Sequence, residues 1–442
     1  MSWILTTPVS RRFPRSALGT QTLAALLSLS LGACAGKSPS PAPVAGQVPV
    51  QPAISSNDGV PASQPAPTTL LKDGLPAAGF YNNSDNPVVY AMVDGATISL
   101  DIEIYQMSDK AFFAGIRRAL ARGVRVRVVR EPAAGDGCKI FAAAVATDDP
   151  SCADQKLLRD QILVQGGAFV PFNKATLCAD PTQPCVEHGK MVIADQNTVM
   201  ISTGNFNPTN LCDAAESPAR CDRDFSFVIR NSAATSLLGQ VFDGDLRGVS
   251  YDLKGMLAAT EVQAVTVSPW SLAPLIAFIG TAKRTIRLEN QYLKEPALNQ
   301  ALVDAAQRGV HVEITLASAC AFGHPSAADA RLLTRLMTPF DAAGISVAML
   351  PTAFRINGTP GYLHAKAIVV DEATAWVGSV NGSNAALTNN REFGYFFSGA
   401  ADVANLNQIL RDDHASPDME SWNDALLCTK DELSGGGTAA LR

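Results

Sequence analysis

Two segments of the chain carry the same four reactive side chains at the same spacing. Each set has a histidine, a lysine two residues later, an aspartate five residues after the lysine and an asparagine ten residues after the aspartate. The first set is His188, Lys190, Asp195 and Asn205, and the second is His364, Lys366, Asp371 and Asn381. A single histidine and lysine at this spacing would be interpreted as surface residues. Because the whole set occurs twice, we interpret it as functional.

The spacing predicts that the reactive groups of each set meet at one end of a β-hairpin. Residues two apart on a strand point to the same face of a sheet, so His188 and Lys190 share a face. A turn centred between Gln196 and Asn197 places His188 opposite Asn205, and the second set repeats this relation. Lysine ammonium and asparagine amide groups are hydrogen-bond donors that suit the oxygens of a phosphate.

Two half-sites with one histidine each suit a two-step displacement at phosphorus. Histidine acts as a nucleophile or as a general acid. One histidine attacks phosphorus, while the other protonates the departing oxygen and then activates water for the second step. If lysine and asparagine neutralise the phosphate charge, the reaction needs no metal, and we expect neither a metal nor another cofactor.

Hydroxyl and carboxylate side chains near each set are further candidates for the site. Thr203 and Ser379 lie between the aspartate and the asparagine of their sets. Asp224 and Glu392 follow in two similar tripeptides, Arg-Asp-Phe and Arg-Glu-Phe. A carboxylate at each place would accept a hydrogen bond from a histidine ring and fix its tautomer. The alternative is a surface acid beside an arginine.

Repeated secondary-structure patterns precede both sets and must position them. Each half begins with a β-branched strand pattern, continues with a helix that stops at Arg-Gly-Val and ends in a second strand. In the first half these elements are expected at 98–105, 110–121 and 125–129, and in the second at 286–292, 296–307 and 311–316. The β-α-β order predicts a parallel sheet with helices on its faces.

The composition limits the classes of protein to which the chain can belong. Its 442 residues suggest two or three domains. Hydrophobic residues make up 47% and charged residues 17%, so the chain can build a sizeable core and is not a disordered polyelectrolyte. The net charge of −6 provides no basic field that would attract DNA or anionic lipid.

Residues 1–34 have the features of an export signal. Three arginines precede an almost uncharged apolar stretch that ends in Leu-Gly-Ala-Cys, which resembles a bacterial lipobox with cleavage before Cys34 and lipidation of its thiol. The alternative is an ordinary signal peptide with an incidental cysteine. Cleavage removes three arginines and no acid, so the net charge changes from −6 to −9. We expect a protein of the cell envelope, lipid-anchored on the periplasmic side of the outer membrane, or a periplasmic one.

Behind this signal, the chain divides into a linker and two expected repeats. Residues 35–69 are rich in proline and predict an extended linker. The repeats are expected at 70–252 and 253–442. Eight cysteines remain in the exported chain, and an even number in an oxidising compartment predicts disulfides. Cys178 with Cys185 and Cys212 with Cys221 are close enough in sequence to close loops, although buried free thiols are the alternative.

The two motifs resemble those of the phospholipase D superfamily, whose signature is H-x-K-x4-D followed by G-S-x-N. The resemblance covers most of residues 80–430, and the first copy departs from it because Ser202-Thr203 replaces Gly-Ser. It implies an α/β fold of two pseudo-symmetric α-β-α sandwich units with mixed sheets around one central active site. It also implies that His188 is the nucleophile, that His364 is the acid and base, and that both motif aspartates are supports.

The family resemblance leaves the substrate open among lipids and nucleic acids. The expected lipid anchor, the negative charge and two motifs in one chain favour a monomeric enzyme that hydrolyses or transfers the phosphatidyl group of glycerophospholipids at a membrane surface through a phospho-histidine. A periplasmic endonuclease acting on DNA or RNA is the alternative, although nucleic acid fits the charge poorly. A degenerate binding module is a third hypothesis, and the intact histidines and lysines argue against it.

Overall fold

The computed structural model describes residues 69–85, 87–141, 150–259 and 263–431. The expected signal segment, Cys34 and nearly all of the expected linker lie outside these residues. Among the described helices, none is both long and apolar enough to cross a membrane.

The first half is built on a seven-stranded mixed sheet. Its strands β2, β3 and β4 run parallel, whereas β5 runs antiparallel to β2. The strand order is β1 (Gly79–Asn82), β8 (Phe225–Ile229), β6 (Thr198–Ser202), β5 (Lys190–Ala194), β2 (Ser99–Ile104), β3 (Arg125–Arg130) and β4 (Ala168–Pro171).

The second half repeats this arrangement in an eight-stranded sheet. Strands β10, β11 and β12 are parallel, and β15 runs antiparallel to β10. The order is β18 (Glu420–Ser421), β12 (Ser346–Leu350), β11 (His311–Ala317), β10 (Thr285–Asn290), β15 (Ala367–Val370), β16 (Thr374–Gly378), β17 (Phe393–Phe397) and β9 (Val265–Val267). The chain is therefore an α/β protein with two pseudo-symmetric sheet-containing halves.

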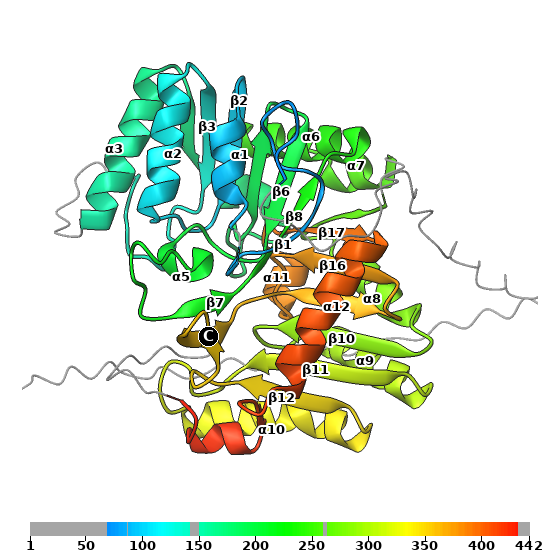
Figure 1. Cartoon of the computed structure of the whole chain (residues 1–442). Helices are drawn as coiled ribbons and strands as arrows, with labels where there is room; N and C mark the ends of the chain where they lie inside the picture. Colours follow the sequence, from blue (N-terminus) through cyan, green and yellow to red (C-terminus); the bar gives the residue numbers. More distant parts are fainter. Residues whose placement is uncertain (1–68, 86, 142–149, 260–262, 432–442) are drawn as a thin grey trace, which may run out of the picture. The chain divides into compact units, whose positions relative to one another are not determined.

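Helices cover the outer faces of both sheets, while the inner faces share one core (Figure 1). The outer helices are α1 (Val89–Gly95), α2 (Lys110–Ala121) and α3 (Pro150–Val164) on the first sheet, and α8 (Leu272–Gly280), α9 (Pro296–Gln307) and α10 (Ala327–Ala342) on the second. The shared core contains α6 (Ser232–Arg247) and α12 (Ala400–Ala415) together with the inner faces of both sheets. Shorter helices are α4 (Lys174–Leu177), α5 (Pro208–Leu211), α7 (Leu253–Ala259), α11 (Asn384–Thr388) and the 3₁₀-helix Asp424–Leu427.

A third, small sheet joins the two halves through their backbones. It consists of β13 (Arg355–Ile356), β14 (Thr359–Leu363) and β7 (Cys221–Arg223). Strand β14 of the second half pairs in parallel with β7 of the first. A parallel bridge between Glu187 and Arg391 makes the reciprocal connection. The two halves are thus interlocked beside both histidine motifs.

The predicted helices at 110–121 and 296–307 are confirmed by α2 and α9, and the strand pairs are parallel as predicted. The predicted hairpin register is wrong by one residue. Ala194 pairs with Thr198. Continued to His188, this register would set residue 204 opposite the histidine, whereas the prediction set Asn205 there. Two successive residues with positive φ, Asp195 at 51° and Gln196 at 60°, form the turn and leave the next residue outside the ladder. The second half repeats this geometry.

The described cysteines form four disulfides, which include both loop-closing pairs suggested by the sequence. The pairs are Cys138–Cys152, Cys178–Cys185, Cys212–Cys221 and Cys320–Cys428. The boundary expected between residues 252 and 253 stays a prediction.

Candidate active site

The two histidine motifs lie at the junction of the halves, each just before an inner strand. His188 precedes β5 and His364 precedes β15. The backbone N–H of His188 donates to the carbonyl of Arg391 at 2.8 Å, and that of His364 donates to the carbonyl of Arg223 at 3.2 Å. Each histidine is therefore held by the backbone of the opposite half. Their side chains are 14% and 10% exposed, which leaves each ring a small opening.

Each histidine ring is paired with a carboxylate from the other half. Nδ1 of His188 lies 2.9 Å from Oε2 of Glu392, and Nδ1 of His364 lies 3.0 Å from Oδ1 of Asp224. Both carboxylates are fully buried. A carboxylate at Nδ1 favours the tautomer with its proton on Nδ1, so Nε2 keeps a lone pair. The expected pairing thus occurs, and it crosses between the halves.

The two motif lysines are fully buried, each beside the histidine of its own motif. Nζ of Lys190 donates to the carbonyl of His188, while Nζ of Lys366 donates to the carbonyl of Thr203 at 3.2 Å. Desolvation lowers the pKa of Lys190 to about 8 and that of Lys366 to about 7. Lys366 also approaches both ring nitrogens of His364 at 3.2 Å.

Burial favours the neutral form of both histidine rings. Desolvation, assisted by the charge of Lys366, lowers the pKa of His364 to about 4. Desolvation also lowers the pKa of His188, against the opposing effect of Glu392. Neutral imidazole is the nucleophilic form, and a bound phosphodiester anion would raise the pKa of both rings towards the value that a general acid needs.

The motif asparagines and hydroxyl groups surround the same place. Asn205 and Asn381 are buried, and the side-chain oxygen of each has no hydrogen-bond partner among the described residues. Oγ1 of Thr203 donates to Asp224 at 2.6 Å, and the hydroxyl of Ser379 accepts from the backbone of Phe393 at 3.0 Å. The two hydroxyl groups therefore fix the segments that carry the crossed carboxylates.

The motif aspartates lie at the opposite end of their strands from the histidines. Asp195 accepts hydrogen bonds from the backbone N–H groups of residues 97, 98 and 99, and Asp371 accepts from those of residues 283, 284 and 285. These bonds join the hairpin turn to the beginning of β2 or β10. The geometry places both aspartates in a supporting position.

Sequence reasoning missed the arginine anchors that support the crossed carboxylates. Arg391 makes a bidentate ion pair with Asp245 on α6, with N–O distances of 2.7 and 3.0 Å. Arg223 makes the equivalent pair with Asp413 on α12 at 2.7 and 2.9 Å. Both arginines precede the carboxylate that holds a histidine, so each Arg-acid dipeptide is inserted into the other half. The repeated Arg-Asp-Phe and Arg-Glu-Phe tripeptides were the available signal.

A second buried acid accompanies each arginine anchor. Glu103 on β2 is close to Asp245, and Glu289 on β10 is close to Asp413. Desolvation, followed by the charge of the neighbouring aspartate, raises the pKa of each glutamate well above its ordinary value. Each glutamate lies in a strand that alternates polar and apolar residues, with Asp101 two residues before Glu103 and Arg287 two residues before Glu289, so the sequence pattern does not single it out.

Aromatic and amide groups complete the surroundings of the two rings. Tyr105 packs against His188 with ring centroids 5.0 Å apart, and Tyr362 stacks near His364 at 6.4 Å. Nδ2 of Asn210 donates to Asp224 at 2.7 Å. The site as a whole offers two imidazoles, two buried cations and amide groups around one position, which suits displacement at a phosphate.

Comparisons with known proteins agree with this chemistry. The family model described as "Cardiolipin synthase, PLD-like domain" matches residues 89–246 and 275–414, more than half of the chain. Phosphatidylserine synthase of Haemophilus influenzae superposes with a TM-score of 0.53 at 12% identity, covering 81% of this chain and 90% of that one. Polyphosphate kinase of Porphyromonas gingivalis gives 0.51 at 15% identity, covering 77% and 51%. These two structures show the fold alone.

A smaller match is the phospholipase D family member Nuc of Salmonella typhimurium, with 26% identity, a TM-score of 0.28, and coverage of 34% of this chain and 91% of that one. No curated protein sequence matches the chain.

Proposed function

Because the chain belongs to the phospholipase D superfamily of phosphodiesterases and phosphatidyltransferases, we propose that it hydrolyses or transfers the phosphatidyl group of glycerophospholipids. The observation that carries this proposal is the pair of imidazoles whose Nδ1 atoms are held by crossed carboxylates around two buried lysines. The match to a family described by cardiolipin synthase supports a lipid substrate.

The proposed reaction has two steps. In the first, Nε2 of His188 attacks phosphorus, the bond from phosphorus to the head-group oxygen breaks, and His364 in its protonated form donates a proton to that oxygen. In the second, His364 removes a proton from water or an alcohol, whose oxygen attacks phosphorus and breaks the bond to His188. The product is phosphatidic acid with water, or a new phosphatidyl ester with an alcohol.

The buried cations and the crossed carboxylates have distinct parts in these steps. Protonated Lys190 and Lys366 offset the negative charge of the phosphate. Their burial strengthens this electrostatic attraction because little water screens it. Glu392 and Asp224 hold the rings and stabilise each imidazolium when it forms. The choice of His188 as nucleophile comes from the family resemblance, since burial favours the neutral form of both rings and each carries a carboxylate at Nδ1.

The proposed location is the cell envelope, with the chain anchored through a lipid on Cys34. The expected lipobox supports this location. The net charge of −9 after cleavage bears on the substrate instead, because it disfavours a polyanionic nucleic acid. A monomer is proposed because one chain supplies both half-sites. Labelling with radioactive palmitate, and its loss in Cys34→Ser, would test the anchor.

A substrate panel tests the proposed activity. Glycerophospholipids with different head groups, with and without ethanol, are offered beside single- and double-stranded DNA. Wild type is expected to release phosphatidic acid, and phosphatidylethanol when ethanol is present. His188→Ala and His364→Ala should each lose at least about a thousandfold in rate because the two histidines act as one unit. Rapid DNA cleavage without any lipid cleavage would refute the proposal.

Trapping identifies the nucleophile. His364→Asn should accumulate a phosphatidyl group on His188 because the second step lacks its base, and His188→Asn should accumulate none. Mass spectrometry of peptides from an acid-free digest locates the modified residue. A modified His364 in the His188→Asn variant would reverse the assignment of roles.

A further inference from the structure

An arginine of the first half is inserted between two aromatic rings of the second half. The guanidinium carbon of Arg220 lies 4.8 Å from the ring centroid of Phe322 and 4.5 Å from that of Tyr362. The two rings meet edge to face, with centroids 5.0 Å apart. A guanidinium that packs on aromatic rings keeps its N–H groups in a fixed orientation, so their direction is set before any ligand binds.

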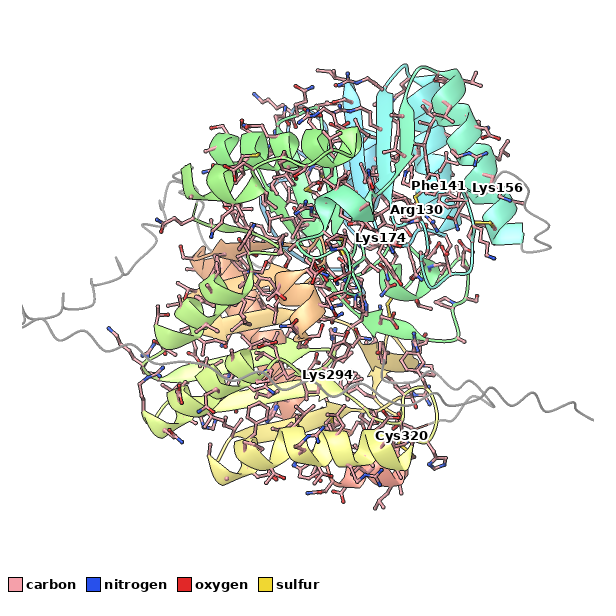
Figure 2. All side chains as sticks on the ribbon, turned by 180° about the vertical axis from the view of Figure 1, so that it is seen from behind. Arg130, Phe141, Lys156, Lys174, Lys294 and Cys320 are labelled. Atoms are coloured by element: carbon pink, nitrogen blue, oxygen red, sulfur yellow. A yellow bond between two sulfur atoms is a disulfide. The ribbon has the colours of Figure 1, made fainter. Side chains whose placement is uncertain are left out.

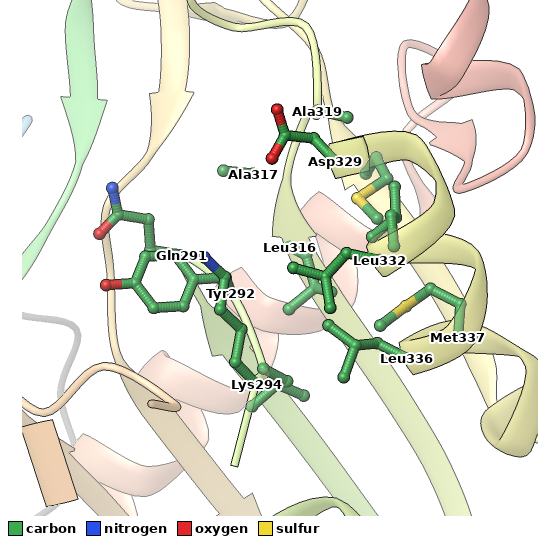
Figure 3. A pocket seen from close by; sticks show the side chains of 13 residues that line it. Gln291, Tyr292, Lys294, Leu316, Ala317, Ala319, Asp329, Leu332, Leu336 and Met337 are labelled. Atoms are coloured by element: carbon green, nitrogen blue, oxygen red, sulfur yellow. The ribbon is translucent and has the colours of Figure 1, made fainter. Parts of the chain in front are cut away.

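The two rings are themselves held in place by neighbouring groups. Phe322 follows Cys320 by two residues, and the disulfide between Cys320 and Cys428 fixes this loop, which the label of Cys320 locates in Figure 2. The hydroxyl of Tyr362 accepts a hydrogen bond from Nε2 of Gln291 at 2.6 Å. Figure 3 shows the amide of Gln291 directed away from the leucine side chains of the neighbouring apolar pocket.

The guanidinium of Arg220 is anchored at its inner end and open at its outer end. Nε donates to Oδ1 of Asp222 at 2.9 Å, whereas Nη1 and Nη2 have no hydrogen-bond acceptor among the residues that the structure describes. The side chain of Arg220 is 26% exposed and that of Asp222 is 4% exposed. A fixed guanidinium with open outer N–H groups matches the paired oxygens of a carboxylate or a phosphate.

Two sets of contacts connect Arg220 to the imidazole of His364. Tyr362 precedes His364 by two residues, and their rings stack with centroids 6.4 Å apart, so the guanidinium and the imidazole are neighbours of the same ring. In the second set, Oδ2 of Asp222 accepts from Nδ2 of Asn210 at 2.8 Å, and the same Nδ2 lies 3.3 Å from Nδ1 of His364. Each contact from Arg220 to His364 in this set is at hydrogen-bond distance.

Arg220 lies on the side of the site from which the head group departs in the proposed reaction. His364 protonates the departing head-group oxygen, so the head group lies beside His364 and not beside the attacking ring. The two halves differ here, because Arg220 stands four residues before Asp224 and the matching residue before Glu392 is Thr388. The additional cation therefore belongs to one half-site alone.

We propose that Arg220 binds a second anionic group, a carboxylate or a phosphate, in the head group of the lipid. The inference rests on the proposed function, which it deepens by restricting the substrate class to glycerophospholipids with a second anion in the head group. The same geometry disfavours a choline head group, because the two rings that would enclose a quaternary ammonium already enclose the guanidinium of Arg220.

Binding of water-soluble head-group analogues tests this subsite without turnover. Glycerophosphoserine and glycerophosphoethanolamine, which differ by one carboxylate, are titrated into the full chain by calorimetry. Glycerol 1,3-bisphosphate is compared with glycerol 3-phosphate in the same way, and His188→Ala is present in every protein to prevent cleavage. In at least one pair the extra anion should raise affinity about tenfold, the effect of one charge-assisted hydrogen bond. The pair that shows the preference identifies the group as carboxylate or phosphate.

Substitutions of Arg220 show whether this residue is the origin of the preference. Arg220→Met keeps a long side chain between the rings and should reduce the preference to about twofold or less. Arg220→Lys keeps the charge without the planar fork and should retain an intermediate preference. Arg308→Met, at an exposed position where α9 ends, is the matched control and should keep the full preference.

The ratio of the two affinities in each pair decides between the outcomes. Equal affinities in both pairs with Arg220 intact overturn the subsite, even if lipids are cleaved in the substrate panel. A full preference that persists in Arg220→Met overturns it as well. If the preference depends on Arg220 and no lipid is cleaved, the subsite stands and the proposed activity fails. A purely structural role of Arg220 would lower both affinities of a pair together, and the unchanged ratio would count against the proposal.

Discussion

Replacing Glu103 by glutamine tests whether the buried acid pairs share one proton. Glu103 is fully buried, and neither of its carboxylate oxygens has a hydrogen-bond donor among the described residues. Two ionised carboxylates cannot bond to each other, whereas a protonated Glu103 donates to its neighbour Asp245. Desolvation raises the pKa of Glu103 well above 4.5, and the charge of Asp245 adds to this rise. We therefore expect Glu103 to be neutral at pH 7.

The expected magnitudes follow from that charge state. Glu103→Gln replaces one neutral group by another of the same shape and should change the free energy of unfolding by about 1 kcal/mol or less. Arg391→Met removes the only cation that pairs with Asp245 in the described residues, and loss of one partner of a buried ion pair costs about 3–5 kcal/mol. The prediction is therefore that Glu103→Gln lowers the free energy of unfolding much less than Arg391→Met does.

The pH dependence supplies an independent measurement. Because the pKa of Glu103 is higher in the folded than in the unfolded chain, its contribution to stability is complete below pH 4.5 and is lost as the pH rises towards the folded value. Each pH unit in this window removes about 1.4 kcal/mol. Guanidinium unfolding at a series of pH values gives the free energy of unfolding against pH, and its slope in this window should be smaller by this amount in Glu103→Gln. Glu289→Gln is the matched variant in the second half.

An unfolding free energy that falls by more than about 3 kcal/mol in Glu103→Gln, with the wild-type pH slope retained, would mean that Glu103 is ionised. The shared-proton interpretation would then be refuted, and Arg391 would have to compensate two negative charges.

Other consequences of the structure can be tested directly. The rate constant kcat/KM should fall as the pH rises through about 7, where Lys366 loses its proton, and Lys366→Arg should move this fall towards the pKa of Lys190 at about 8; an unmoved profile would exclude Lys366 as its origin. Glu392→Gln should lower kcat on the order of 10²–10⁴-fold with little change in melting temperature because it withdraws support from the His188 imidazolium, whereas Glu372→Gln on an exposed ion pair should leave kcat unchanged. Replacing both Cys212 and Cys221 by serine should lower the free energy of unfolding by about 3 kcal/mol and reduce activity because β7 leads to Asp224. The same change at Cys138 and Cys152 should lower stability alone, and an equal loss of activity there would contradict the assigned role of β7.

The elements and the reactive residues could be predicted from the sequence because they are encoded locally. The helix at 110–121 is specified by apolar spacing and a following glycine, and the residues His188 and Lys190 are specified by repetition. The hairpin register required knowledge of the backbone, because Asp195 and Gln196 both adopt positive φ although neither is glycine. Four donors, the backbone N–H groups of residues 97, 98 and 99 and the hydroxyl of Thr97, make five hydrogen bonds to the Asp195 carboxylate, which stabilises that turn from outside the hairpin.

The crossing of the carboxylates could not be predicted, since spacing along one repeat does not show which repeat a side chain enters. The tripeptide that contains Asp224 follows the first motif in sequence, yet its carboxylate contacts the histidine of the second. The burial of Glu103 and Glu289 could not be predicted either, because a strand pattern does not show which residue of another element packs against each side chain. Only the three-dimensional arrangement shows that Asp245 and Asp413 each form an ion pair with the arginine of the opposite half.

The exchange of Arg-acid dipeptides explains why neither repeat is sufficient for the proposed chemistry. Without the second half, His188 loses Glu392 and the backbone carbonyl that binds its N–H, while Asp245 loses the cation that compensates its buried charge. The second half alone leaves His364 and Asp413 in the same condition. The groups that orient the histidines and the groups that make the interface electrostatically stable are neighbours in sequence. Any change that separates the two halves therefore also removes the groups that orient the histidines. The proposed chemistry thus requires that the two halves stay packed together.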